Sequence, residues 1–499
     1  MAENKPSRRT ALKIVAAAVI AGAVAGVGGY SLGISTAPPA KTVTKTETTT
    51  KTVTKTITAT TTTTPPTTTT TPPTIKGPVR YCGGMWVMDP EIAKEFEKQT
   101  GIKLEYTVPP TGWISSHLIA TKGEGWDVGH TATMELKPIL YSPYIKPIPV
   151  SKIRRWTREG IFYAFHNPDE VLWYGGQKDE LTASQFKELL WKPGEEGKTF
   201  LGVPIAFSWD AVGYNPEYIP YTEEGGKKSL SFGEILNKEW KGRAGIRGIA
   251  CLEVNSYSNY LYRTGQFKPE IRNNLKPEEV DFIVDYLIPY MKEGHYVAFW
   301  GSEGEGATLF STREMWISNA MTPVVMAVRR AGVPCSYAMN STGIEFWYTS
   351  DFISAKTDRF DAACEFINFR LSPWWTDYIY KKHVYTTPSF VSPEVRSYMG
   401  AEFYDWAYMG KATYKSTDEW FREMWPEKGE VPKRIADALF LPEKYEWSKE
   451  EGTPHPQGKL REQGSVKDRI ENSGFMLYWA DYGDYYVEAW SKLRTYMPK

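Results

Sequence analysis

A stretch of threonine and proline limits which part of this chain can fold. Residues 41–74 contain 21 threonines, two Pro-Pro pairs and almost no bulky apolar side chain. Such a segment cannot bury enough surface to offset the entropy of ordering it, so we expect an extended, solvated stalk of roughly 100 Å. Its composition is typical of an O-glycosylated stalk, with an undecorated linker as the alternative. The folded part is expected to cover 75–499.

The segment before the stalk, residues 1–40, has the layout of a twin-arginine export signal. Arg8 and Arg9 precede an uncharged run that is almost wholly Ala, Val, Ile and Gly from residue 14 to residue 30. About twenty such residues could span a membrane, and the basic residues ahead of them favour a cytoplasmic N-terminus. The sequence leaves open whether this segment is cleaved or stays as a membrane anchor. In both cases we expect an extracellular protein at the cell surface.

The charge of the folded part excludes one class of partner. The whole chain has 59 basic and 59 acidic residues, but residues 75–499 have 51 and 57, a net charge of −6. Because a nucleic-acid-binding domain favours a basic face, we expect no nucleic-acid partner. The 19 tryptophans and 31 tyrosines serve packing for the most part, but their rings can also hold cations or stack on sugars. The composition is compatible with a cationic or a neutral ligand.

Local signals predict an α/β fold. A strand at 79–82 precedes a helix that Asp89 caps and Gly101 ends, and a second strand follows at 102–106. Strand, helix and strand in this order indicate a βαβ unit with a parallel sheet. Apolar residues at helical spacing predict further helices at 278–293, 361–371 and 479–493.

The sequence determines two features of the folded part, the segment 400–475 and the cysteines, less closely than the elements above. The segment 400–475 is polar, punctuated by proline and rich in Trp and Tyr, so we expect an irregular insertion. Four cysteines lie far apart in the sequence. An exported protein can form disulfides, and the sequence allows one or two here without assigning their pairing. The cysteines are Cys82, Cys251, Cys335 and Cys364.

Six short stretches, in this order, resemble the extracellular solute-binding proteins of ABC importers, specifically the spermidine/putrescine-binding type. They are AKEFEKQTGIK at 93–103, GWDV at 125–128, GVP to GYN at 202–215, EWKGRAG at 239–245, AVRRAG at 327–332 and DAACEFINF at 361–369. The resemblance implies a two-lobed, type II periplasmic-binding-protein-like α/β fold whose lobes hinge shut over a ligand in the cleft. The lobes would be about 78–204 with 318–395, and about 210–317 with the C-terminal part.

The resemblance also implies a function. The chain would be a binder and not an enzyme, and it would deliver a small-molecule solute to the membrane permease of an ABC importer. One departure bears on the ligand: polyamine binders follow the first strand with an aromatic residue and an acid, whereas this chain has Gly84, Met85 and Trp86. A neutral sugar or a peptide-like ligand is therefore an alternative to a polyamine-like ligand.

Five aromatic residues are candidates for the ligand site. The alternative is packing on the lobe for Trp86, a surface turn for the loop of Trp300, and core packing for Trp316, Trp347 and Tyr348. Trp86 follows the first strand, and the carboxyl ends of parallel strands are where such sheets bind ligands. Trp300 begins a glycine-rich loop that would let the backbone approach a ligand closely. Trp316 resembles the family's tryptophan at the second crossing between the lobes. Trp347 and Tyr348 lie on the return to the first lobe.

Three acids are candidates to meet a cation or hydroxyl groups. Asp210 lies on the stretch that crosses between the lobes, Glu253 falls near where polyamine binders place acids, and Glu303 belongs to the glycine-rich loop. The alternatives are a turn-capping aspartate, a solvated carboxylate and a surface turn, respectively.

A secreted carbohydrate-active hydrolase is the alternative function, since it would share the export signal, the stalk and the aromatic content. It needs two carboxyl groups about 5–9 Å apart across a cleft. Glu303 and Glu305 are two positions apart on a glycine-rich loop, which does not set that geometry. The six histidines show no metal-ligand spacing, so we expect no metal. We also expect no cofactor and no catalytic residue.

Overall fold

The computed structural model describes residues 77–109, 114–173, 176–219, 230–411, 463–476 and 478–498. Ile75–Lys499 make up one unit, and the expected export signal and stalk lie outside the described residues. Among the helices in the described ranges, none is both long and apolar enough to cross a membrane.

The first elements form the parallel unit that the sequence predicts. Strands β1 (Val79–Cys82) and β2 (Leu104–Thr107) pair in parallel, and helix α2 (Pro90–Thr100) connects them. The Asp89 carboxylate accepts two backbone N–H groups of the first helical turn, and Gly101 ends the helix with a left-handed φ of 71°. The local prediction is confirmed because caps act between residues a few positions apart.

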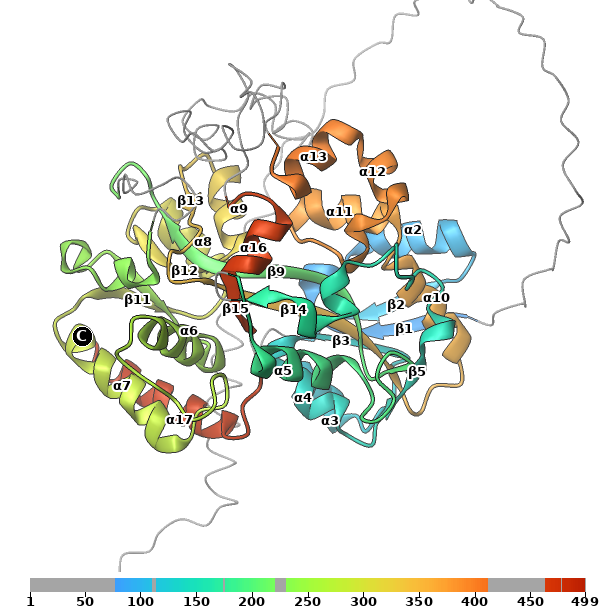
Figure 1. Ribbon diagram of the computed structural model, residues 1–499, viewed down its shortest axis with the longest axis horizontal. Helices are drawn as coiled ribbons and strands as arrows, with labels where there is room; N and C mark the ends of the chain where they lie inside the picture. Colours follow the sequence, from blue (N-terminus) through green and yellow to red (C-terminus); the bar gives the residue numbers. More distant parts are fainter. Residues whose placement is uncertain are drawn as a thin grey trace, which may run out of the picture. The chain divides into compact units, whose positions relative to one another are not determined.

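One large sheet runs through the described part of the chain, in the order β11-β10-β12-β9-β14-β3-β1-β2 (Figure 1). The other strands on this path are β3 (Val128–Ala132), β9 (Val203–Tyr214), β10 (Ala244–Arg247), β11 (Tyr296–Trp300), β12 (Ile317–Met321) and β14 (Ile344–Ser354). At its centre, β9 and β14 are long, antiparallel and buried at every residue. Such strands must be covered on both faces, so they can connect two separate cores.

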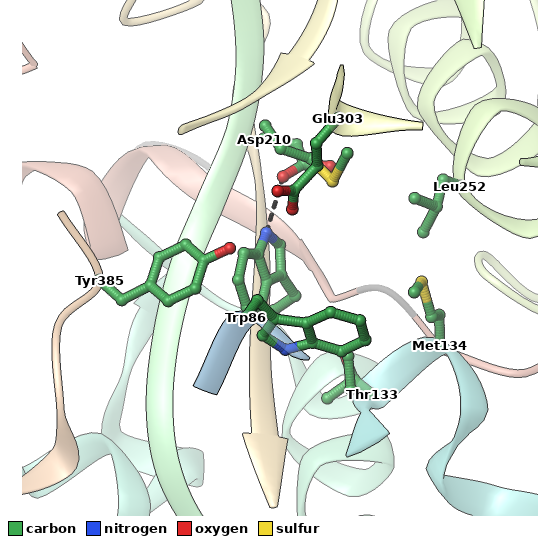
Figure 2. Close-up of a pocket in the computed structure, with 10 residues that line it drawn as sticks. Trp86, Thr133, Met134, Asp210, Leu252, Glu303 and Tyr385 are labelled. Carbon is green, nitrogen blue, oxygen red and sulfur yellow. Dashed lines mark hydrogen bonds between the residues drawn. The ribbon is translucent and has the colours of Figure 1, made fainter. Parts of the chain in front are cut away.

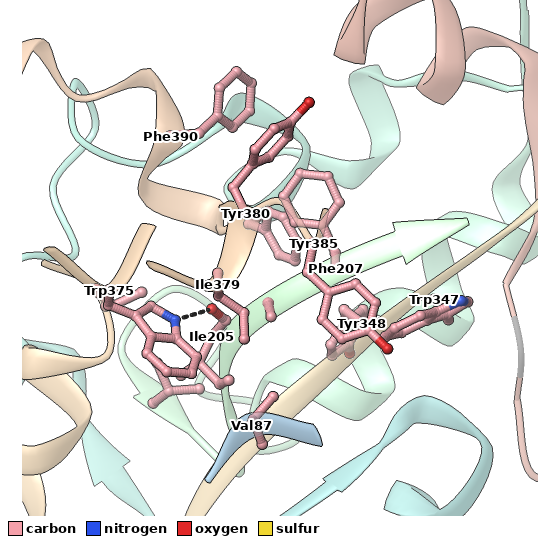
Figure 3. Packing of buried hydrophobic residues seen from close by; sticks show 14 of the residues in the cluster. Val87, Ile205, Phe207, Trp347, Tyr348, Trp375, Ile379, Tyr380, Tyr385 and Phe390 are labelled. Carbon is pink, nitrogen blue, oxygen red and sulfur yellow. Dashed lines mark hydrogen bonds between the residues drawn. The ribbon is translucent and has the colours of Figure 1, made fainter. Parts of the chain in front are cut away.

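Two hydrophobic cores flank these central strands. The first contains rings such as those of Phe207, Tyr348 and Trp375, and Figure 3 shows how closely they pack. The second lies under α6 (Ala250–Arg263) and α7 (Pro277–Lys292). The other helices referred to below are α4 (Thr133–Leu140), α8 (Glu303–Ser311), α10 (Phe360–Phe369), α11 (Pro373–His383) and α17 (Gly483–Arg494). The predicted helices at 278–293, 361–371 and 479–493 correspond to α7, α10 and α17.

The expectation of an irregular segment at 400–475 is wrong at both of its ends. Helix α13 (Ala401–Met409) buries aromatic residues in the first core, and helix α16 (Val466–Asn472) begins with a capping box at Ser465. Strand β15 (Ser473–Met476) then pairs in parallel with β14. Polar composition concealed these elements because tertiary packing supplies their stability. Residues 412–462 lie outside the described residues.

All four cysteines are buried and none is part of a disulfide, so the disulfides that the sequence left open are not formed. Each thiol lies within apolar packing; burial raises the pKa of Cys82 to about 11, for example. Buried apolar surroundings keep a thiol protonated and unreactive. The cysteines therefore act as small core residues.

Candidate functional site

A cavity of about 60 Å³ lies beside the two central strands (Figure 2), and most of its apolar lining side chains belong to the first core or pack against it. Its walls combine three aromatic side chains, two acids, the hydroxyl groups of Thr133 and Tyr385, and several apolar side chains. The lining residues are Trp86, Ala132, Thr133, Met134, Asp210, Leu252, Glu303, Met321, Trp347 and Tyr385. Four of the eight candidates from the sequence lie here: Trp86, Asp210, Glu303 and Trp347.

Trp86 reaches the cavity from a short 3-10 helix, Met85–Val87, that follows β1. Its indole folds back over Gly84, where a Cβ atom would overlap the ring. The buried Arg370 guanidinium donates a hydrogen bond of 2.7 Å to the carbonyl oxygen of Val87, and so holds the turn. The Gly-Met-Trp sequence that departs from the polyamine binders thus has a local reason, since only glycine leaves room for this ring.

Trp347 and Tyr385 form two walls of the cavity at right angles. Their ring centroids are 5.1 Å apart and their planes meet at 87°. Tyr385 follows Val384, which ends α11 in the left-handed region with a φ of 58°. The next residue, Thr386, exchanges two backbone hydrogen bonds with Phe207 of β9, so the chain on both sides of Tyr385 is held.

Asp210 belongs to a buried charge cluster behind the cavity. Arg247, at the end of β10, lies 2.5 Å from Asp210 and 3.6 Å from Glu345, and also pairs with Glu253. Asp210 and Glu345 are register partners on β9 and β14. All four side chains are almost fully buried. One guanidinium thus faces three carboxyl groups, and burial raises the pKa of each of these acids despite the arginine.

Glu303 is the acid of the cavity without a protein partner. It occupies the first position of α8, whose N-cap is Ser302, and it is half-buried. Within the described residues, its carboxylate makes no hydrogen bond and no ion pair, in contrast to Asp210. Burial, together with the charge of Asp210, raises the pKa of Glu303 to about 7. The group is therefore partly ionised near neutral pH.

Two predicted tryptophans do not line the cavity. Trp300 is fully buried and donates a hydrogen bond of 3.0 Å to the hydroxyl of Ser318. Its ring packs on Gly306, where a Cβ atom would lie 2.8 Å away, so this glycine serves helix packing and not ligand approach. Trp316 lies at the margin of the second core, stacked on Tyr218 at 4.3 Å with the Arg243 guanidinium 5.0 Å from its ring centre.

The other two candidates are also elsewhere. Glu253 is committed to the buried cluster, where the amide of Asn319 donates to it at 3.0 Å. Tyr348 points into the first core, against Phe165 and Phe186. Adjacent residues of a strand face opposite sides, which explains why Trp347 lines the cavity and Tyr348 does not.

Sequence patterns did not indicate six of the lining residues, among them Thr133, Met134 and Tyr385. Thr133 and Met134 follow the carboxyl end of β3, a place where the rule for parallel strands could have found them. No local signal marks Tyr385, because its position depends on pairing with β9. In the described ranges, no group of His, Cys, Asp and Glu side chains is arranged to hold a metal ion.

No protein-family model matches the chain, and no curated protein matches it in sequence. Solved structures do resemble it. One is a spermidine/putrescine ABC transporter substrate-binding protein from Streptococcus pneumoniae, at 14% identity, with a TM-score of 0.51, covering 84% of this chain and 98% of that chain. Another, from Listeria monocytogenes, is described in terms of a spermidine/putrescine ABC transporter and matches at 14% identity, with a TM-score of 0.50 and 84% and 99% coverage.

Identity this low shows the fold alone. The fold that the sequence predicts, a type II periplasmic-binding-protein-like α/β fold with two lobes and a cleft between them, is confirmed.

Proposed function

We propose that this chain captures a small organic cation, a class that includes polyamine-like solutes, in the cavity beside its central strands and delivers it to the permease of an ABC importer. The observation that carries the proposal is the unpaired, half-buried Glu303 carboxylate, which lies among the rings of Trp86, Trp347 and Tyr385. A cation would neutralise this carboxylate and at the same time contact the faces of the rings.

The buried cluster behind the cavity supports a positively charged ligand. Asp210, Glu253 and Glu345 share the charge of Arg247, and burial raises the pKa of all three, so the cluster has excess negative charge only where more than one of them is ionised. Charge that is out of water is weakly screened, so this excess would act on a ligand in the cavity. A neutral sugar or peptide would gain nothing from it.

The likeness in fold supports capture and delivery. The two structures compared above carry names that refer to ABC transporters, and capture by closing lobes would suit this fold. The lobes would be 78–204 with 318–395, and 210–317 with the C-terminal part. An export signal and a stalk would hold the binder at the cell surface, near a permease.

The hydrolase alternative lacks support. Of the two acids that line the cavity, Asp210 is bonded to Arg247 and to Trp347, and only Glu303 is free. Glu305 turns its carboxylate back to the backbone N–H of Gly301, at 2.8 Å, and faces a different cavity. A hydrolytic pair of free carboxyl groups is therefore absent from the described lining.

Titration calorimetry and thermal shift on the full chain test the proposal. The ligands would be linear polyamines, alkylammonium ions, neutral oligosaccharides and short peptides. Binding at one site per chain, with about 2.7 kcal/mol of added stability at one hundred times the Kd, is expected for cations only. Trp316→Ala serves as a matched control that should bind normally. Consumption of a ligand, or stoichiometric binding of neutral solutes alone, would contradict the proposal.

A further inference from the structure

The aromatic rings enclose one point of the cavity from several sides. Trp347 and Tyr385 meet at 87°, and Trp86 adds a third ring from a different element. Figure 2 shows the rings of Trp86 and Tyr385 below the Glu303 carboxylate. A cation that contacts several ring faces at once gains from each of them, and the gain is larger where water is excluded.

The negative charge of the cavity lies at one end only. Glu303 and Asp210 are neighbours, as Figure 2 shows, and Thr133, Met134 and Leu252 line another side of the cavity. Both oxygens of Asp210 already accept hydrogen bonds, from Arg247 and from Trp347. A linear diamine or polyamine carries a second ammonium group, which would lose hydration at this wall, where the Thr133 hydroxyl is an acceptor but no counter-charge is present among the described lining residues.

The chemistry of the walls also distinguishes between kinds of ammonium group. Each N–H that leaves water needs an acceptor, and the lining offers few besides Glu303. Methyl groups on nitrogen need none, and they pack well against rings and against the soft thioethers of Met134 and Met321. The cavity is small, at about 60 Å³, which suits a compact head group.

We propose that the ligand carries a single quaternary ammonium group, enclosed by Trp86, Trp347 and Tyr385 and neutralised by Glu303. This inference rests on the proposed function, because it specifies the class of cation that the same site takes. It differs from a polyamine-like ligand in the number of charges and in the absence of N–H donors.

Competition among matched ligands tests the inference on the full chain. Tetramethylammonium and choline are expected to bind at least tenfold more tightly than butylamine, putrescine or spermidine. The neutral tert-butyl analogue of choline has the same shape without the charge, and it should bind at least tenfold more weakly than choline. Tighter binding of putrescine or spermidine would overturn this inference and leave the proposed function intact. Failure of every cation to bind would overturn both.

Two variants at the N-terminus of α8 test which carboxylate is the counter-charge of the ligand. Glu303→Gln should weaken choline binding at least tenfold and leave the weak binding of the neutral analogue unchanged. Glu305→Gln, two positions further along α8 and facing another cavity, should bind choline like the wild type. Melting temperatures without ligand establish that both variants fold. Equal affinity of Glu303→Gln and wild type for choline would overturn the assignment of Glu303 as the counter-charge.

Discussion

The indole nitrogen of Trp347 donates a hydrogen bond of 2.7 Å to Oδ1 of Asp210, and so joins a wall of the cavity to the charge cluster behind it. Asp210 in turn bonds Arg247 at 2.5 Å. The ring that would contact the ligand is therefore positioned by a residue whose own position depends on a buried ion pair. Substitutions in the charge cluster should therefore alter the position of the Trp347 ring in the cavity wall.

Trp347→Phe keeps an aromatic ring and removes this hydrogen bond. We expect a loss of about 1.5–3 kcal/mol in the free energy of unfolding, because a buried charged acceptor loses its donor. Cation affinity should fall as well, since the ring is no longer fixed. Urea unfolding and titration calorimetry measure the two effects. Trp316→Phe, which loses a bond to the carbonyl of Arg313 outside the cavity, is the control and should leave affinity unchanged.

Arg247→Met should destabilise the protein by about 3–5 kcal/mol, because three buried acids lose the cation that they share. Their pKa values, already raised by burial, should rise further. The folded state then holds protons that the unfolded chain releases above about pH 4.5, so the variant should lose stability as the pH rises toward neutral.

Unfolding by urea at about pH 5 and pH 8 measures this dependence. Arg243→Met changes an arginine that lies over Trp316 away from the cluster, and it should have little effect. Equal stability of Arg247→Met at both pH values would contradict the assigned charges.

Cation affinity should depend on pH through Glu303, whose pKa burial raises to about 7. A bound cation favours the ionised carboxylate, so affinity should level off above about pH 8 and fall up to tenfold per pH unit below about pH 7. The stability of the ligand-free protein should change in the opposite direction and fall as the pH rises. The unfolded chain ionises this group near 4.5, so stability from Glu303 is lost as the pH rises from there to about 7.

Calorimetric titrations across this range measure the effect, and two variants assign it. Glu135, on α4, has its pKa raised to about 7 by burial and is a second group that titrates here. Glu303→Gln should abolish the pH dependence of affinity, and Glu135→Gln should retain it. A slope that persists in Glu303→Gln would assign the dependence to another group.

Gly84→Ala should reduce affinity far more than stability. The added methyl group would overlap the Trp86 indole, and the ring can leave more easily than the backbone can move. We expect at least a tenfold weaker Kd and less than about 1.5 kcal/mol of destabilisation. Gly304→Ala, next to Glu303 and with nothing near its Cβ position, is the control and should bind normally. Wild-type affinity in Gly84→Ala would show that Trp86 does not contact the ligand.

Local features of the fold were predictable because they depend on close neighbours in the sequence. The cap at Asp89, the stop at Gly101 and the periodicity of α7 each act within a few residues. The same reasoning misjudged Trp300 and Gly306: tryptophan, glycine and acid together favoured a ligand loop. The structure instead uses Gly306 to let α8 pack on Trp300.

The site was predictable only in part, because strand register and long-range pairing decide which side chains meet. Trp347 and Tyr348 are adjacent members of the first core, but only Trp347 also lines the cavity. Tyr385 reaches the cavity through backbone bonds between Thr386 and Phe207, which no pattern within its own segment indicates.

The sequence by itself determined where the folded part is expected to begin, the βαβ start of the fold and the types of residue that could meet a ligand. Composition, caps and periodicity carry that information locally. Only the tertiary structure decided that Asp210 is committed to Arg247 while Glu303 is free. The physical reason is that charges and rings from β9, β10, α8 and β14 acquire their partners, and their burial, only when these distant segments pack together.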